Sequence, residues 1–159
     1  MARELGLGVT PWSPLKSGVL SGKYARADHG KHNAGRGAFA TSALSEKTYD
    51  LLDELTKLAG ELRTTVSRVA ISWVMARPGV TSTIIGARTM DQLEDNLAAA
   101  DVELSPGHLE HLDALSKPML DFPADFIANG TSFLHGGTTI NGRSAPPWPL
   151  SPKGDDDRF

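Results

Sequence analysis

The chain has 159 residues, of which 40% are hydrophobic and 22% charged, with a formal net charge of -3. This composition is typical of a globular protein, and the small negative charge gives no general attraction to nucleic acid or anionic membranes. The lack of cysteine excludes disulfides and thiolate metal sites. No apolar run is long enough to span a membrane and no signal peptide is evident, so we expect a soluble, cytoplasmic protein.

The first predicted element is a buried strand at residues 5–12, "LGLGVTPW", a short apolar run bounded by glycine and proline. The segment that follows its end, residues 12–24, reads "WSPLKSGVLSGKY" and is called the serine–glycine loop below. Residues 21–44 continue as a basic, glycine-rich stretch without periodicity. A loop of that length within a compact domain is usually functional or disordered.

Two amphipathic helices are predicted next. Leucines recur with helical spacing over residues 51–62, and a second apolar stripe over residues 66–74 starts behind Thr65, a good N-cap. Residues 80–86, "VTSTIIG", are uncharged and largely β-branched, which predicts a strand buried on both faces.

Two further helices follow this second strand. The first is predicted to begin with a capping box at residues 89–92 and to run to about residue 99. The second begins at Ser105, where Leu104 and Leu109 occupy the two positions of a hydrophobic staple.

This order of elements predicts an α/β fold with parallel strands. Two strands are too few, because a parallel pair needs neighbours to satisfy its outer edges. Either other chains supply the remaining strands, or this chain is part of a larger fold. Residues 118–159 are rich in Pro, Gly and Asn and show no periodicity, so we expect an irregular tail.

In α/β folds, ligands bind where strands end and the next loop or helix begins. The serine–glycine loop lies at such a point, and its serines, lysines and glycines suit a diphosphate. It lacks the spacing of a Walker motif and of GxGxxG. An ordinary glycine-rich turn has the same composition, so both interpretations stay open for this segment alone.

Residues 86–96, called the Gly86 segment below, follow the second strand. Gly86 and Ala87 allow close approach to a helix N-terminus, and Arg88 is a fork-shaped donor for a phosphate monoester. Three polar side chains of the next helix share a surface that suits adenine or ribose: Gln92, Asp95 and Asn96. The alternatives are a surface ion pair for Arg88 and an exposed polar role for Asn96.

Taken together, the two segments resemble the C-terminal part of the aldo-keto reductases, and more loosely the aryl-alcohol-dehydrogenase-like branch. The resemblance rests on "GVTPWSPLKSGVLSGKY", "TVSRVAISWVMARPGVTSTIIGARTMDQLEDNLAA" and "ELSPGHLEHLDALS". It implies the last two strands of a TIM (β/α)8 barrel, with residues 1–117 as the barrel segment and 118–159 as the C-terminal tail. It also implies hydride transfer between NADPH and an aldehyde or ketone in the complete enzyme.

The resemblance further implies how NADP(H) is bound. Trp12 stands where the family's aromatic residue stacks on the nicotinamide, and the serine–glycine loop would line and cover the pyrophosphate. The Gly86 segment would hold the 2′-phosphate and the adenosine, which favours NADPH over NADH. The implied cofactor-binding residues are Trp12, Ser13, Pro14, Leu15, Ser17, Gly18, Lys23, Gly86, Ala87, Arg88, Gln92, Asp95 and Asn96.

The family's catalytic Asp, Tyr, Lys and His would lie N-terminal to the matching segments, and no substitute set is found here. Tyr24 and Tyr49 are the only tyrosines, and packing is the expected role of Tyr49. His108 and His111 have helical spacing that suits a metal, but no third ligand is evident. We therefore expect no catalytic and no metal-binding residue. The alternatives are a non-catalytic NADP(H)-binding or regulatory module and a structural or interaction protein whose exposed sheet edges recruit a partner. We also expect the chain to self-associate through its open sheet edges.

Overall fold

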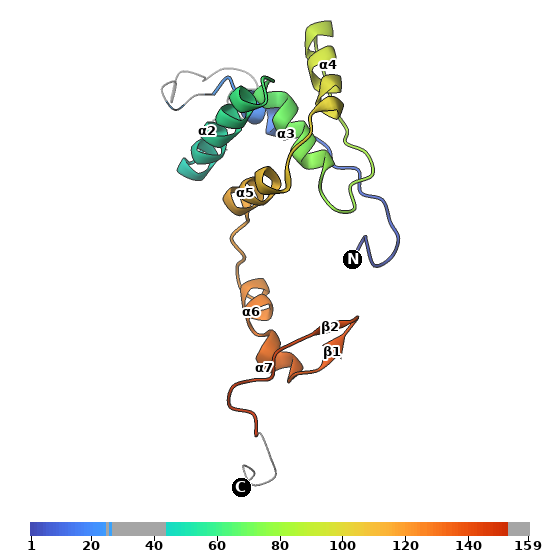
Figure 1. Ribbon diagram of the computed structural model, residues 1–159, viewed down its shortest axis with the longest axis vertical. Helices are drawn as coiled ribbons and strands as arrows, with labels where there is room; N and C mark the ends of the chain where they lie inside the picture. Colours follow the sequence, from blue (N-terminus) through green and yellow to red (C-terminus); the bar gives the residue numbers. More distant parts are fainter. Residues whose placement is uncertain (25, 27–43, 153–159) are drawn as a thin grey trace. The chain divides into compact units, whose positions relative to one another are not determined.

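The computed structural model describes residues 1–24, 26 and 44–152 (Figure 1). These residues belong to two compact units, Met1–Lys117 and Pro118–Phe159. Most of the basic stretch expected at residues 21–44 lies outside the described residues. The serine–glycine loop and the Gly86 segment, both expected to bind a nucleotide, belong to the first unit.

The first unit is built mainly of helices. They are the 3-10 helices η1 (Lys16–Ser21) and η3 (Ala98–Asp101) and the α-helices α2 (Glu46–Glu61), α3 (Val66–Met75), α4 (Met90–Leu97) and α5 (Pro106–Ser116). The N-caps predicted at Thr65, Thr89 and Ser105 are confirmed, because each hydroxyl accepts a hydrogen bond from the backbone N–H three residues on. These caps fix where α3, α4 and α5 begin.

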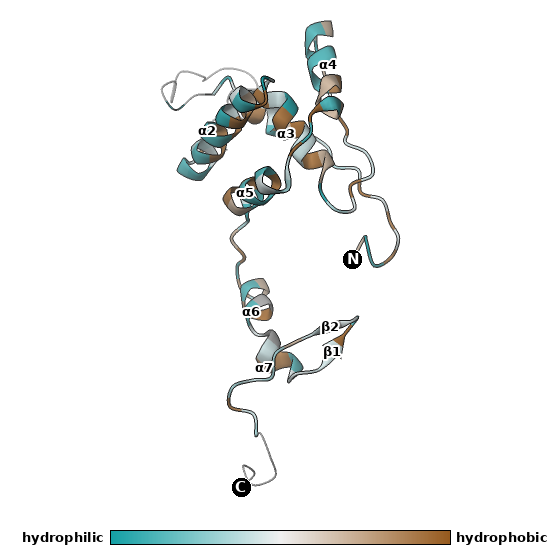
Figure 2. Cartoon of the chain, in the orientation of Figure 1, coloured by the Kyte–Doolittle hydropathy of each residue, from teal (hydrophilic) through white to brown (hydrophobic). Residues whose placement is uncertain are grey.

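Helices α2, α3 and α5 enclose the core. Its fully buried side chains are apolar and come from all three helices: Leu55, Leu58, Ala59, Val69, Ala70 and Leu112. The hydrophobic residues of α3 appear as brown segments in Figure 2. A second cluster contains Val19 of η1 together with Tyr24, Tyr49 and Leu52, so the packing role expected for Tyr49 is confirmed.

The two predicted strands form only a short parallel ladder. Val9 bridges Val80 and Trp12 bridges Ile84, both in parallel. The expected burial on both faces is wrong, since Trp12 is 79% exposed and Ile84 is 54% exposed. A strand is buried only when other strands flank it and other layers cover its faces, and within the described residues these two segments pair only with each other.

The second unit contains short elements where an irregular tail was expected. Helices α6 (Ala124–Asn129) and α7 (Thr131–His135) precede an antiparallel pair, β1 (Thr139–Ile140) and β2 (Arg143–Ser144). The rings of Phe133 and Trp148 meet edge to face at 5.5 Å between centroids. Elements of two to six residues are too short to produce a readable hydrophobic period.

Among the described residues, no helix has the length and apolar character needed to cross a membrane.

Candidate nucleotide-binding site

The serine–glycine loop turns tightly at the end of the first ladder segment. Ser13, Lys16 and Ser17 have φ values of 54°, 48° and 56°, in the left-handed region that non-glycine residues rarely adopt. The turn is closed by local hydrogen bonds: the Lys16 N–H donates to the Ser13 carbonyl at 2.8 Å, and the Ser17 N–H donates to Ser13 Oγ at 3.2 Å. Backbone strain of this kind is concentrated at binding sites.

Apolar contacts hold this strained loop against the helices. Val19 is completely buried, and Leu15 and Leu20 pack on the main core. At Gly22, where φ is +80°, an added Cβ would lie 3.1 Å from Cγ2 of Val66 in the first turn of α3. The loop therefore rests directly on the beginning of α3.

The side chain of Lys23 folds back toward Gly18 in the serine–glycine loop. A Cβ added at Gly18 would lie 3.3 Å from Lys23 Nζ, so the glycine makes room for the ammonium group. Tyr24 and Arg26 contact α2, because Tyr24 is buried against Tyr49 and Leu52 and Arg26 pairs with Glu46 and with Asp50. The structure thus brings one cation and the backbone of Gly18 together, beside a loop that carries the hydroxyls of Ser13 and Ser17.

Trp12 lies at the entrance to this loop with most of its ring in solvent. Its backbone belongs to the parallel ladder, since it bridges Ile84. An exposed indole fixed at a strand end offers a flat apolar surface on which a planar ring can stack.

The Gly86 segment is shaped by hydrogen bonds from its own helix. The side-chain amide of Asn96, which is 7% exposed, donates from Nδ2 to the Gly86 carbonyl at 3.2 Å. The backbone N–H of Arg88 donates to Oε1 of Gln92 at 3.0 Å. Gln92 therefore reaches the residue before the N-cap Thr89, and not the cap itself as expected of a capping box.

Arg88 is exposed beside the N-terminus of α4. No ion pair of its guanidinium is found in the part of the chain that the structure describes, which disfavours the alternative of a surface ion pair. A guanidinium beside a helix N-terminus is a favourable environment for a phosphate dianion.

Asp95 has a different environment from Gln92 and Asn96. Its carboxylate accepts hydrogen bonds from Thr65 Oγ1 at 3.0 and 3.1 Å and from Arg68 Nε at 2.8 Å. Sequence reasoning did not find Thr65 and Arg68 as neighbours of the site. They are separated from Asp95 by 30 and 27 residues, and no local pattern connects them.

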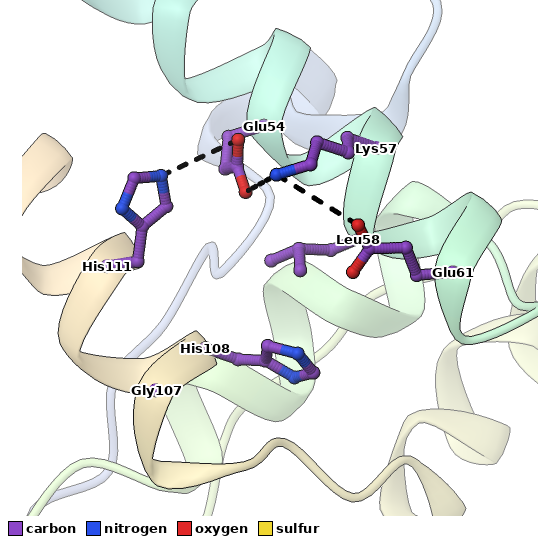
Figure 3. A pocket seen from close by; sticks show the side chains of 7 residues that line it. All are labelled: Glu54, Lys57, Leu58, Glu61, Gly107, His108 and His111. Carbon is purple, nitrogen blue, oxygen red and sulfur yellow. Dashed lines mark hydrogen bonds and ion pairs between the residues drawn. The ribbon is translucent and has the colours of Figure 1, made fainter.

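The two histidines considered as metal ligands have structural contacts. His108 Nδ1 accepts from the Ser105 N–H at 3.4 Å and completes the capping box of α5. His111 Nε2 lies 3.5 Å from Oε2 of Glu54, across an open hollow between α2 and α5 (Figure 3). Lys57 also pairs with Glu54 there. The described part of the chain contains no group of three side chains suited to hold a metal ion.

Comparison with known proteins identifies similar sequences. A sequence model of the aldo/keto reductase family matches residues 1–117. An uncharacterised oxidoreductase of Bacillus subtilis is 39% identical over 112 residues, which are 70% of this chain and 33% of that protein. A probable voltage-gated potassium channel subunit beta of Oryza sativa subsp. japonica is 37% identical over 121 residues, 71% of this chain and 37% of its own.

A probable aryl-alcohol dehydrogenase of Saccharomyces cerevisiae is 26% identical over 147 residues, which are 91% of this chain and 45% of that protein. This chain therefore spans less than half of the length of each of these three relatives.

Proposed function

Because the chain belongs to the aldo/keto reductase family, we propose that it is the NADP(H)-binding, C-terminal part of a carbonyl-reducing oxidoreductase. The observation that carries the proposal is the arrangement of the serine–glycine loop and the Gly86 segment at the end of the parallel ladder. The serine–glycine loop and the Gly86 segment follow two chain segments that pair in parallel, at Trp12 and Ile84. Both segments therefore lie at the same end of the ladder, where α/β folds bind ligands.

Each segment has a distinct role in this proposal. Trp12 would stack on the nicotinamide, while the serine hydroxyls, the backbone of Gly18 and Lys23 would hold the pyrophosphate. Arg88 would pair with the 2′-phosphate, with Gly86 and Ala87 giving it close access. Gln92 and Asn96 support that part of the site through hydrogen bonds to Arg88 and Gly86. NADPH, when bound, supplies the hydride, and these residues bind and orient it.

The residue that protonates the carbonyl oxygen would come from a segment that is not among the 159 residues of this chain. We propose that the tetrad of Asp, Tyr, Lys and His is supplied by earlier strands, N-terminal to the segments present here, and that further strands of the same barrel cover Val9 and Ile84, which are 37% and 54% exposed here. Those strands would complete a TIM barrel. The 159-residue chain alone is therefore expected to bind NADPH without reducing carbonyl compounds, and a fused N-terminal segment carrying the tetrad is expected to confer turnover.

Calorimetric titration of the 159-residue chain with NADPH and with NADH tests the binding role. We expect NADPH to bind more tightly, and Arg88→Gln to remove roughly 1.5–3 kcal/mol of that binding, as for loss of a charge-assisted hydrogen bond. NADH binding should be nearly unchanged in this variant. Arg3→Gln, an exposed arginine in the same unit, is the matched control. Absence of NADPH binding by folded chain would refute the proposal.

A second candidate is a non-catalytic, NADP(H)-binding regulatory module. It is favoured by the similarity to the rice protein named as a potassium channel subunit beta, together with the exposed apolar residues along the ladder. The two candidates differ in one result. A regulatory module binds NADPH but gains no carbonyl reduction when an N-terminal segment carrying the tetrad is fused to it.

A further inference from the structure

The chain that leaves the serine–glycine loop is fastened to α2 at Arg26. Its Nη2 lies 2.8 Å from Oδ1 of Asp50 and 3.6 Å from Oδ2 of Asp53, and its Nη1 pairs with Glu46. These three carboxylates follow one another at helical spacing, so they share one face of α2. The guanidinium also lies over the ring of Tyr49, 5.2 Å from its centroid. Arg26 and the three carboxylates are called the Arg26 clamp below.

The clamp is a network and not an isolated surface pair. The side chain of Arg26 is 42% exposed, and a single ion pair of that exposure contributes little because water and salt screen it. Here one planar guanidinium donates hydrogen bonds to both Glu46 and Asp50, and it reduces the repulsion among the carboxylates. It also stacks on Tyr49, which is 2% exposed and is held in the core.

Lys23 lies three residues before Arg26, in the same anchored segment. Tyr24 follows Lys23 and belongs to the buried cluster that contains Tyr49. The Nζ of Lys23 lies 5.7 Å from the centroid of the Tyr24 ring and 3.3 Å from the position of a Cβ built on Gly18. Among the residues that the structure describes, no carboxylate pairs with Lys23. Its ammonium group is therefore available to an anion beside Gly18.

We infer that Arg26 is a positioning residue, which fastens the chain after Lys23 to α2 and so holds the Lys23 ammonium beside Gly18. This inference rests on the proposed function, in which Lys23 and the backbone of Gly18 hold the pyrophosphate. A lysine side chain is flexible, so its contact with a phosphate costs less when the chain that carries it is already fixed. Arg26 acts through Lys23, because its own guanidinium is engaged by the carboxylates of α2.

For the carboxylates of the clamp, positioning and electrostatic attraction predict opposite effects. The double substitution Glu46→Gln and Asp50→Asn removes two negative charges. Because NADPH is an anion, electrostatic attraction alone would make it bind this variant more tightly. We expect calorimetric titration to show binding that is roughly threefold to fivefold weaker, because Lys23 is in place for a smaller fraction of the time. Unchanged or tighter binding would overturn the inference.

The matched control removes two carboxylates elsewhere on α2. Glu54→Gln with Glu61→Gln takes away the partners of Lys57 and leaves the Arg26 clamp intact. This variant should bind NADPH at least as tightly as the unchanged chain. Adenosine 2′,5′-bisphosphate has no diphosphate bridge, so its binding to the clamp variant should change by less than about twofold. Equal weakening for NADPH and this fragment would show that the clamp acts through the fold as a whole and would overturn the inference.

A double-mutant cycle shows whether Arg26 acts through Lys23. Lys23→Met should weaken NADPH binding roughly tenfold, as for loss of one charge-assisted contact. Arg26→Gln should weaken it less, and should have little further effect when Lys23 is already replaced. Arg26→Lys keeps the charge without the planar fork, so it should retain only part of the affinity. Additive losses for Lys23→Met and Arg26→Gln would overturn the inference.

The clamp is also measurable in the ligand-free chain. Trypsin cuts after lysine, and its rate at the bond after Lys23 reports how often this segment leaves α2. We expect Glu46→Gln with Asp50→Asn to raise that rate several-fold, while cleavage after Arg68 within α3 stays constant. Mass spectrometry distinguishes the two cuts. An equal rise at both sites, or no rise after Lys23, would overturn the inference.

The two proposals fail in different experiments. If the unchanged chain binds no NADPH while cleavage after Lys23 depends on the clamp carboxylates, the nucleotide-binding function is refuted and the anchoring of Lys23 is upheld. If NADPH binds but neither its affinity nor the cleavage responds to those carboxylates, the function is upheld and the positioning role is refuted.

Discussion

At the scale of single residues, Gly22 decides whether the serine–glycine loop can rest on α3. Its φ of +80° is unfavourable for a side chain, and a Cβ would lie 3.1 Å from Val66. We predict that Gly22→Ala lowers the free energy of unfolding by about 1–2 kcal/mol, as measured by urea denaturation.

Gly60 is the matched control for that substitution. It lies in α2 with nothing within 4 Å of an added Cβ. Gly60→Ala should therefore stabilise the chain by roughly 0.5–1 kcal/mol, because alanine restricts the unfolded chain and favours the helix. If both substitutions raised or both lowered the free energy of unfolding, the role given to Gly22 would be contradicted.

The contribution of Asp113 to the stability of the fold is expected to depend on pH. A hydrogen bond from Arg77 lowers the pKa of Asp113, and a further one from Trp73 acts in the same direction. Because the folded pKa is below the unfolded value of about 3.9, the contact stabilises the fold above that value and is lost as the pH falls through the folded pKa. We predict that Asp113→Asn costs up to about 1 kcal/mol at neutral pH, given its exposure.

Urea unfolding of this variant and of the unchanged chain over a series of pH values gives the measurement. The difference in stability should shrink as the medium becomes acidic. A difference that stays constant from neutral to acidic pH would show that the ion pair contributes nothing and that the substitution acts through packing.

At the scale of elements, α5 begins with a capping box in which histidine takes the place of the usual glutamate or glutamine. The His108 N–H donates to Ser105 Oγ at 3.2 Å, and His108 Nδ1 accepts in return. Ser105→Ala should cost about 1 kcal/mol, the usual value for a lost cap. His108→Gln should be nearly neutral in the same denaturation assay, since its amide oxygen can accept the same bond. A large loss on His108→Gln would indicate another role for the imidazole.

Elements set by local signals could be predicted from the sequence, and those set by distant neighbours could not. Thr65, Thr89 and Ser105 cap helices because each hydroxyl needs only a backbone N–H three residues away. The burial of residues 5–12 and 80–86 was predicted wrongly because it depends on strands and layers beyond these segments. The sequence predicted correctly that the serine–glycine loop and the Gly86 segment follow two segments that pair in parallel. The partners of Asp95 were not, since they lie on another helix.

At the scale of the whole molecule, the parallel ladder leaves apolar surface in contact with water. Val9 and Ile84 of the ladder are 37% and 54% exposed, Trp12 is 79% exposed, and Leu7, which precedes the ladder, is 57% exposed. Exposed apolar side chains along an open strand edge favour association with another strand. This surface is where we place the strands that complete the proposed barrel. In their absence, a second copy of the chain can occupy it.

We therefore predict that the 159-residue chain self-associates and that the combined substitutions Leu7→Lys and Ile84→Lys reduce this association. Two buried lysines per interface would each lose hydration without a partner, which makes the contact unfavourable. Sedimentation velocity over a range of protein concentrations measures the effect, with Leu97→Lys as the control because Leu97 is 58% exposed on α4, away from the ladder bridges. The control should associate like the unchanged chain. A chain that stays monomeric throughout and melts in one sharp transition would refute the prediction, because the exposed ladder would then be stable without a partner strand.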